Sequence, residues 1–339
     1  MKDYDIKYEI RQAKDCDVSS IMNFIDKNWK KGHILGNNRE VFEYEFLEDN
    51  GDVNFLIALD RETGNIEAIS GFLKASHDKN SMDVWGVMWM SRDGNMPFLG
   101  LELEKRRHQI VGSRAEIGVG DNPKTSIPIM KKVLNRFTGK MNQYYMIADR
   151  DDYQIARIIK KPSFERKNGG RGQIIHFNSI DELERVYDFE KNKQQIPYKD
   201  SWYINHRYFQ HVSYIYDVCG IEMGDEVTAI IISRNEMVHN RYVTRIVDYI
   251  GRQESIKEIG WYFNEMLKET GIEYIDFYNL GFNEEYLRSV GFILRDENDP
   301  NIIPNYFHPF LQENVDIWVS SSVEGTLFFK GDADQDRPN

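Results

Sequence analysis

The stretch TRIVDYIGRQESIKEIGWYFNEML, residues 244–267, joins a strand-like segment to an amphipathic helix and decides the fold. Its first half is rich in β-branched and aromatic residues, which favours a buried strand over residues 241–251. In its second half, apolar side chains recur at helical spacing and line one face of a helix: Ile256, Ile259, Phe263, Met266 and Leu267. Gly271 then ends the helix. The sequence therefore predicts a strand, a tight turn and a helix in direct succession.

The same order of elements occurs twice along the chain. Around the opening stretch we expect a hairpin at Glu222–Gly224, a strand at 272–280, a short helix at 283–292 and strands at 293–296 and 324–332. The first half predicts a strand at Ile10, a helix from Asp17, a hairpin over 53–76, a strand at 82–90, a helix at 99–108, a strand at 109–120, a helix at 122–137 and a strand at 140–149. This repetition predicts an α+β protein built from two similar modules.

The composition agrees with two globular domains in a reducing compartment. The chain has 339 residues, of which 41 % are hydrophobic and 29 % charged, so it can bury two cores of ordinary size. We expect the domains at residues 1–180 and 181–339, separated near a charged connector. The two cysteines, Cys16 and Cys219, are too few for a disulfide framework and fit the cytoplasm.

Charge and hydropathy exclude further classes of protein. A net charge of −12 argues against a broad nucleic-acid interface, which needs a basic face. No apolar run approaches the roughly 18 residues of a membrane helix, and the charged start MKDYDIKYEI is unlike a signal peptide. We therefore expect a cytoplasmic protein without membrane insertion or a nucleic-acid partner.

Several segments resemble GNAT acyltransferases. IRQAKDCDVSSIMNFI (10–25) is similar to the opening of such domains, the stretch 244–267 to their core strand, pyrophosphate loop and helix, and NEEYLRSVGFILRD (283–296) to their late helix and strand. NWKKGHILGNNREVFEYEF (28–46) resembles tandem GNAT proteins that N-acylate nucleotide-linked amino sugars for surface polysaccharides. The resemblance implies two tandem GNAT-like domains, with the acceptor on the first and acyl-CoA on the second, and it allows a homodimer.

The resemblance also implies a mechanism. An amine of a dTDP- or UDP-linked amino sugar would attack the thioester of acyl-CoA directly, without an acyl-enzyme. Two departures from the family pattern stand out: the glycine-rich phosphate loop is replaced by Gly251–Ser255, and the usual general-acid tyrosine is replaced by Leu287, with Tyr286 displaced by one position. Protonation of the thiolate would then fall to water or to another group.

The donor pyrophosphate is expected at the turn before the second-module helix. Its residues are Ile250, Gly251, Arg252, Gln253, Glu254 and Ser255. A glycine permits close backbone approach, and a helix N-terminus attracts anions. Glu254 opposes this by adding a negative charge, and an ordinary strand-to-helix turn capped by Ser255 is the alternative. Residues 92–100 of the first module are the second candidate for the donor.

The acceptor is expected near WKKGHI, residues 29–34. Lys30 and Lys31 would bind the diphosphate, Trp29 would stack on a sugar or base, and Arg207 is a further candidate cation. His33 is a candidate catalytic base or acceptor ligand, because its pKa lies near neutrality. The alternative is a solvated helix end with a packed tryptophan and a structural histidine.

The acidic end FFKGDADQDRPN, residues 328–339, has three interpretations. A calcium loop would need a glycine and a later glutamate, and Arg337 and Pro338 follow instead. A solvated tail and an ordered cap on the acceptor pocket remain. In the second case Asp332 would accept the amine proton, and Asp334 and Arg337 would bind the sugar.

No metal site is expected from the histidines. His206 and His211 are five residues apart, a spacing that suits neither a helix nor a strand ligand pair. Two alternatives to the sugar acyltransferase remain open: a Fem-type transferase that uses aminoacyl-tRNA, and a degenerate tandem GNAT protein that binds or scaffolds without catalysis.

Overall fold

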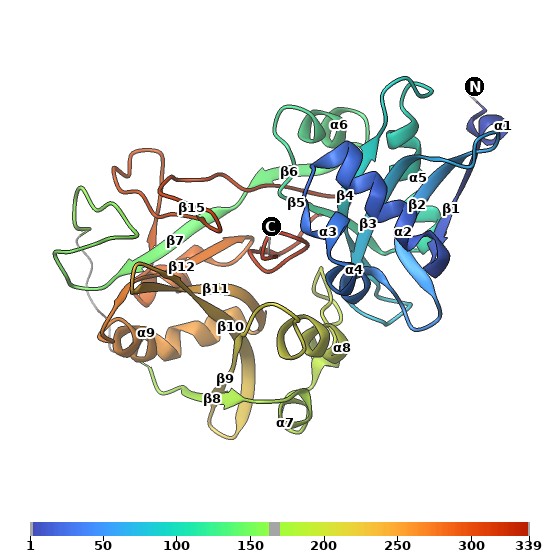
Figure 1. The fold of residues 1–339 in the computed structure, drawn as a ribbon. Coiled ribbons are helices and arrows are strands. Elements are labelled where there is room, and N and C mark those ends of the chain that lie inside the picture. The colour runs from blue at the N-terminus through green and yellow to red at the C-terminus, as the bar shows by residue number, and fades with distance from the viewer. Residues whose placement is uncertain (1–2, 163–169, 338–339) are drawn as a thin grey trace. The chain divides into compact units, whose positions relative to one another are not determined.

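The computed structural model describes residues 3–162 and 170–337 and separates into two compact units. The first unit comprises residues 3–118 together with Arg337, and the second comprises residues 119–336. Figure 1 shows both units, and each is described here by itself. No helix among these residues has the length and apolar character needed to cross a membrane.

The first unit contains five strands of a mostly antiparallel sheet, among which β4 and β5 form the parallel pair. Strands β1 to β4 follow one another as antiparallel neighbours, and β5 pairs parallel to β4 after the crossover helix α5. The elements are α1 (Tyr4–Lys7), β1 (Tyr8–Lys14), η1 (Asp15–Asp17), α2 (Val18–Phe24), η2 (Ile25–Trp29), α3 (Ile34–Asn37), α4 (Arg39–Phe46), β2 (Asp52–Asp60), β3 (Ile66–Lys74), β4 (Asp83–Ser91), α5 (Leu99–Val111) and β5 (Ala115–Val119).

The second unit repeats this order around a larger sheet. Its strands lie in the order β13-β7-β12-β11-β10-β9-β8, and β11 and β12 are the parallel pair. The elements are α6 (Ser126–Lys132), β6 (Phe137–Lys140), β7 (Asn142–Ile147), β8 (Gln173–Phe177), α7 (Ile180–Glu184), η3 (Phe189–Asn192), α8 (Ser201–Ile204), η4 (Asn205–Phe209), β9 (Asp217–Met223), β10 (Glu226–Val238), β11 (Arg241–Gly251), η5 (Gln253–Ile259), α9 (Gly260–Met266), β12 (Ile272–Leu280), α10 (Glu284–Ser289), β13 (Ile293–Leu294), β14 (Tyr306–Phe307), β15 (Phe310–Leu311), β16 (Trp318–Ser321) and β17 (Phe328–Phe329).

The two α+β modules are confirmed. Three predicted elements differ in extent: residues 109–111 continue α5 instead of opening a strand, residue 137 begins β6 instead of ending a helix, and only Phe328–Phe329 of the predicted strand at 324–332 pair as a strand.

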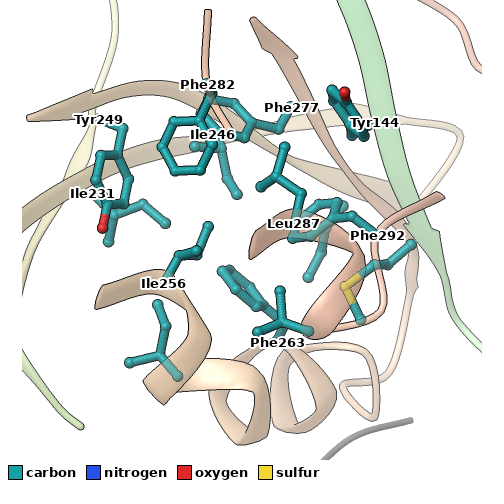
Figure 2. Close-up of a cluster of buried hydrophobic side chains, with 14 of the residues drawn as sticks. Tyr144, Ile231, Ile246, Tyr249, Ile256, Phe263, Phe277, Phe282, Leu287 and Phe292 are labelled. Carbon is teal, nitrogen blue, oxygen red and sulfur yellow. The ribbon is translucent and has the colours of Figure 1, made fainter. Parts of the chain in front are cut away.

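The opening stretch forms β11, η5 and α9, and its apolar residues enter the core that Figure 2 shows. There the side chains of Ile256 and Phe263 lie toward those of Ile246 and Phe277 from the sheet. The predicted helix differs in its first turns, which are a 3-10 helix up to Ile259.

The division of the chain lies earlier than the boundary at residue 180. Strand β7, expected to close the first module, pairs with β12 on one side and β13 on the other. Its residues Tyr144, Tyr145 and Met146 are buried there. Because β7 finds both its backbone partners and its core in the second unit, residues 142–147 pack with that unit.

A buried ion cluster fixes α5 to the sheet of the first unit. Arg107 is 1 % exposed and donates to Glu104 on its own helix, to Glu116 on β5 and to Ser70 on β3, at 2.9, 2.8 and 2.9 Å. A Cβ on Gly86 of β4 would approach the Arg107 guanidinium to 2.8 Å. The guanidinium therefore fills the space that this glycine leaves.

Replacing Arg107 should destabilise the first unit far more than replacing its neighbour. Arg107→Ala leaves two buried carboxylates without their cation, which costs about 3–5 kcal/mol of unfolding free energy. Arg106→Ala removes the partly exposed pairs with Asp5 and Glu102 and should cost at most about 1 kcal/mol. Urea unfolding followed by circular dichroism compares the two, and equal losses would show that the cluster has no special weight.

Candidate functional site

The parallel strands of the first unit separate halfway along β4. Their ladder runs from Asp83–Ala115 to Gly86–Gly118, whereas β4 continues to Ser91. The register of β4 against β3 shifts just beyond this point, and Met88 has a φ of +50°. Such a bulge turns backbone groups out of the ladder. The second half of β4 therefore faces the space where the two strands diverge.

The loop that follows β4 is fastened to the start of α5. The Tyr8 hydroxyl accepts from the Met96 amide at 3.2 Å, and the Tyr4 hydroxyl donates to Pro97 O at 2.8 Å. Phe98, the N-cap residue, has a φ of +70° and is 72 % exposed. The 13-residue helix α5 begins directly behind it. The first-turn amides of a helix have no partner within it and carry its positive dipole end, which suits a phosphate.

The second unit has the same divergence, but the end of the chain occupies it. The ladder between β11 and β12 stops at Ile246–Phe277. β17 then pairs with the free end of β12 through Phe329 and Phe328, and Gly331 N donates to Val247 O on β11 at 2.6 Å. A Cβ on Gly331 would approach the Tyr208 hydroxyl to 2.6 Å. Only glycine therefore fits between the two strands.

The turn at residues 250–255 is closed by its own contacts. Ile250 is buried, and a Cβ on Gly251 would come within 2.6 Å of Thr228 O, so packing accounts for this glycine. The amide of Arg252 donates to Thr228 O at 3.1 Å, and that of Ser255 donates to Arg252 O at 3.1 Å. Gln253 Oε1 accepts from the Asn283 amide at 2.8 Å, and Glu254 is exposed.

The acidic segment is packed, not solvated. Residues 328–333 and Asp336 are buried, and Asp334 is half-buried. The Lys330 ammonium donates to Gln335 O within the segment. Burial, reinforced by nearby arginines, lowers the pKa of Lys330 to about 7. The expectation of an ordered segment is thus met for residues 328–337.

Asp332 belongs to a buried cluster of opposite charges. Its carboxylate lies 2.7 Å from Lys199 Nζ and accepts from the Phe329 amide at 2.9 Å. Lys199 also donates to Asp248 at 2.6 Å, and Tyr208 donates to the same carboxylate at 2.6 Å. Burial raises the pKa of Asp332 to about 6, with Asp248 adding to the rise and Lys199 opposing it.

A second buried cluster holds Asp336. Arg234 donates to both of its carboxylate oxygens at 2.8 and 2.7 Å, and Tyr216 donates to one of them at 2.8 Å. Arg207 donates to the backbone oxygen of Asp336 at 2.8 Å. Burial alone would raise the pKa of Asp336, but Arg234 outweighs it and the pKa falls. Arg207, predicted to bind the acceptor, is thus buried against the tail.

The other predicted residues lie in the first unit. Trp29 ends η2 and is 47 % exposed, and Lys30 and Lys31 are exposed beside it. His33 is buried and caps α3, since its Nδ1 accepts from the Leu35 amide at 3.2 Å. This contact supports the structural reading of the histidine. Arg337 pairs with Glu45 at 2.8 Å.

The sequence did not predict which charged side chains hold residues 328–337 in the fold. Lys199, Asp248 and Arg234 meet residues 332–336 only because β10, β11 and the segment before α8 are neighbours in the fold. Each is an ordinary charged residue in its local sequence. The one available signal was Arg234, which follows the apolar run of a strand in AIIISRNE, residues 229–236. A buried charge at such a place needs a partner elsewhere in the fold.

Comparison with solved structures identifies the fold. A GCN5-related N-acetyltransferase from Anabaena variabilis superposes with a TM-score of 0.56 at 10 % identity, over 93 % of this chain and 72 % of that one. A conserved protein of unknown function from Enterococcus faecalis gives a TM-score of 0.53 at 10 % identity, over 93 % of this chain and 71 % of the other. No family model and no curated protein matches the chain. The predicted α+β, GNAT-like fold is confirmed.

Asp332 should make the stability of the second unit depend on pH. Because its pKa in the folded state is above its ordinary value of 3.8, its contribution to stability is present at about pH 4 and is lost as the pH rises through about 6. Asp332→Asn removes this dependence. When the pH rises from about 4 to about 6, the wild type should therefore lose on the order of 1 kcal/mol more unfolding free energy than the variant. Urea midpoints at both pH values measure it.

The control for this prediction is Asp334→Asn, a half-buried carboxylate two residues away. It should track the wild type at both pH values. A constant difference between Asp332→Asn and the wild type would contradict the assigned role of Asp332.

Proposed function

We propose that this protein is an acyl-CoA-dependent N-acyltransferase and that the acceptor is the amine of a nucleotide-linked amino sugar. The observation that carries the proposal is the divergence of β4 and β5 in the first unit, which leads through the loop at residues 92–98 to the start of α5. The similarity to a GCN5-related N-acetyltransferase supports this choice of chemistry.

The first unit is the better candidate for the donor site. Both units have diverging strands, but in the second the tail pairs with β12 and bonds to β11. The Arg252 and Ser255 amides of its turn are hydrogen-bonded, as are those of Met96 and Leu99 in the first unit, so the tail is the difference between the units. We therefore move the proposed donor site from residues 250–255 to the second candidate of the sequence, residues 92–100.

The proposed reaction needs little from the protein beyond positioning. The neutral amine nitrogen forms a bond to the thioester carbon, the carbon–sulfur bond breaks, and the sulfur leaves as the thiolate of CoA, which takes up, by way of water, the proton that the amine nitrogen releases. Backbone amides at the β4 bulge near Met88 would stabilise the carbonyl oxygen as it gains charge. Leu287 carries no titratable proton and lies in the core of the second unit, so it takes no part in protonation.

The sugar acceptor is the finer part of the proposal and rests on the exposed cations of the first unit. Lys30 and Lys31 lie on the surface next to Trp29, as a diphosphate and a sugar or base would require. The test is direct: acyl-CoA and a panel of dTDP- and UDP-linked amino sugars are incubated with the protein, and acylated sugar and free CoA thiol are measured. Activity that requires aminoacyl-tRNA would select the Fem-type alternative.

A charge placed at the start of α5 should weaken donor binding. Phe98→Asp puts a carboxylate beside the proposed pyrophosphate position and should reduce acyl-CoA affinity about tenfold or more. Aspartate tolerates a left-handed φ better than phenylalanine, so folding should be kept. Isothermal titration with a CoA ester gives the affinity.

The matched variant is Arg252→Asp, at the N-cap of η5 in the second unit, where the side chain is 61 % exposed. Arg252→Asp should leave the acyl-CoA affinity unchanged, even though it changes the net charge more than Phe98→Asp does. If Arg252→Asp weakened acyl-CoA binding and Phe98→Asp did not, the donor site would lie in the second unit. If the wild type bound no CoA ester at all, a non-catalytic role would be favoured.

Replacing Lys31 should affect the acceptor alone. Lys31→Ala removes one cation from the proposed diphosphate contact and should raise the KM for the sugar nucleotide about tenfold, with little change in kcat. Lys27→Ala, another exposed lysine of the same segment, serves as the control. Equal KM values for both variants and the wild type would remove Lys31 from the acceptor site.

A further inference from the structure

Three metal-ligating side chains meet on one face of two neighbouring strands in the second unit. His176 on β8 lies directly opposite Cys219 on β9 in the antiparallel register. Asp217 precedes Cys219 by two residues on β9, so the strand pleat turns both side chains to the same face. His176 faces Cys219 across the two strands, and Asp217 lies two residues before Cys219 on the same face. The three side chains therefore meet at one point. This arrangement was invisible to a search for local histidine spacing.

The ligand atoms already lie at separations close to those of a metal centre. His176 Nδ1 is 2.8 Å from Asp217 Oδ1 and 3.3 Å from Cys219 Sγ, and all three ligand atoms lie within 4.8 Å of one another. Tetrahedral Zn²⁺, with bonds of about 2.0–2.3 Å to nitrogen, oxygen and sulfur, holds its ligand atoms about 3.3–3.6 Å apart. The two separations from His176 lie within a few tenths of an ångström of these values, and the third, between Asp217 and Cys219, is at most 4.8 Å.

The cluster borders a pocket of about 780 Å³. His176 and Asp217 line this pocket, and its wall also includes aromatic and charged side chains, among them Tyr214, Tyr242, Tyr262, Arg234 and Glu269. Cys219 is buried behind them, with its sulfur 4.0 Å from the Tyr262 hydroxyl. A metal ion held by the three ligands would thus keep one coordination position toward the pocket.

We propose that His176, Asp217 and Cys219 form a zinc site whose fourth position is open to this pocket. The donor set of one nitrogen, one oxygen and one sulfur suits Zn²⁺ and Co²⁺ and excludes Mg²⁺ and Ca²⁺, which take oxygen ligands. Water fills the open position when no pocket ligand is bound. The site lies on β8 and β9 and is independent of the proposed transferase chemistry in the first unit.

Binding must displace the proton of the thiol. Burial, together with Asp217, raises the pKa of Cys219, so the metal-free protein carries the thiol rather than the thiolate. When Zn²⁺ binds, the sulfur gives its proton to solvent and its lone pair to the metal. The charge of the ion is then balanced by the thiolate and the Asp217 carboxylate.

Cobalt titration of the full-length protein tests the site without any assay of activity. After treatment with a chelator, Co²⁺ should produce a thiolate-to-cobalt charge-transfer band, and one equivalent of Zn²⁺ should abolish it. Cys219→Ser should lose the band and lower the affinity at least about 100-fold. Cys16→Ser, which changes the exposed cysteine of the first unit, should keep both.

His176→Asn provides the second variant, because this side chain is exposed and its loss should leave the fold intact. It should weaken Co²⁺ binding at least about tenfold while circular dichroism stays unchanged. A wild-type protein without the charge-transfer band, or a band that survives in Cys219→Ser, would overturn the proposal. The three residues would then form only a surface ion pair beside a buried thiol.

Discussion

Two parallel strands that diverge leave backbone amides and carbonyls without a ladder partner, and this constraint governs both units. Buried backbone groups must find another partner, because each one left unpaired costs free energy. In the second unit the chain supplies that partner itself: Gly331 bonds to Val247, and Phe329 pairs with Asn279. In the first unit we propose that the acyl donor takes this role, in which case one fold would meet the same demand in two ways.

Buried charge is the second theme of the structure. Arg107, Lys199 and Arg234 are each enclosed with more than one acidic or polar partner, and none of the three side chains reaches a tenth of its full exposure. Removing two charges from water costs more than a single ion pair returns, so such clusters specify an arrangement more than they add stability. Here they tie α5 to the first sheet and the tail to the second.

Much of what depends on local pattern could be predicted from the sequence. Hydrophobic periodicity and turn residues predicted the hairpins and the apolar face that Ile256, Phe263 and Leu267 turn to the core, because these features depend on neighbouring residues. Short strands such as β6 and β8 carry too little pattern of their own and were not predicted. The site was harder. Whether Gly251 approaches a ligand or only packs against Thr228 depends on a strand that lies elsewhere in the sequence. The three ligands on β8 and β9 likewise required the strand register, which no single stretch of the chain contains.

The place of β7 has a consequence for how the chain acquires its structure. Gln143 on β7 bonds to Asp276 on β12 across 133 residues, and Arg207 meets Asp336 across 129. During synthesis β7 emerges long before its neighbours β12 and β13. Such long-range pairing slows folding and leaves an apolar strand with open edges in the meantime. The edges of β7 therefore stay open until β12 and β13 have been synthesised.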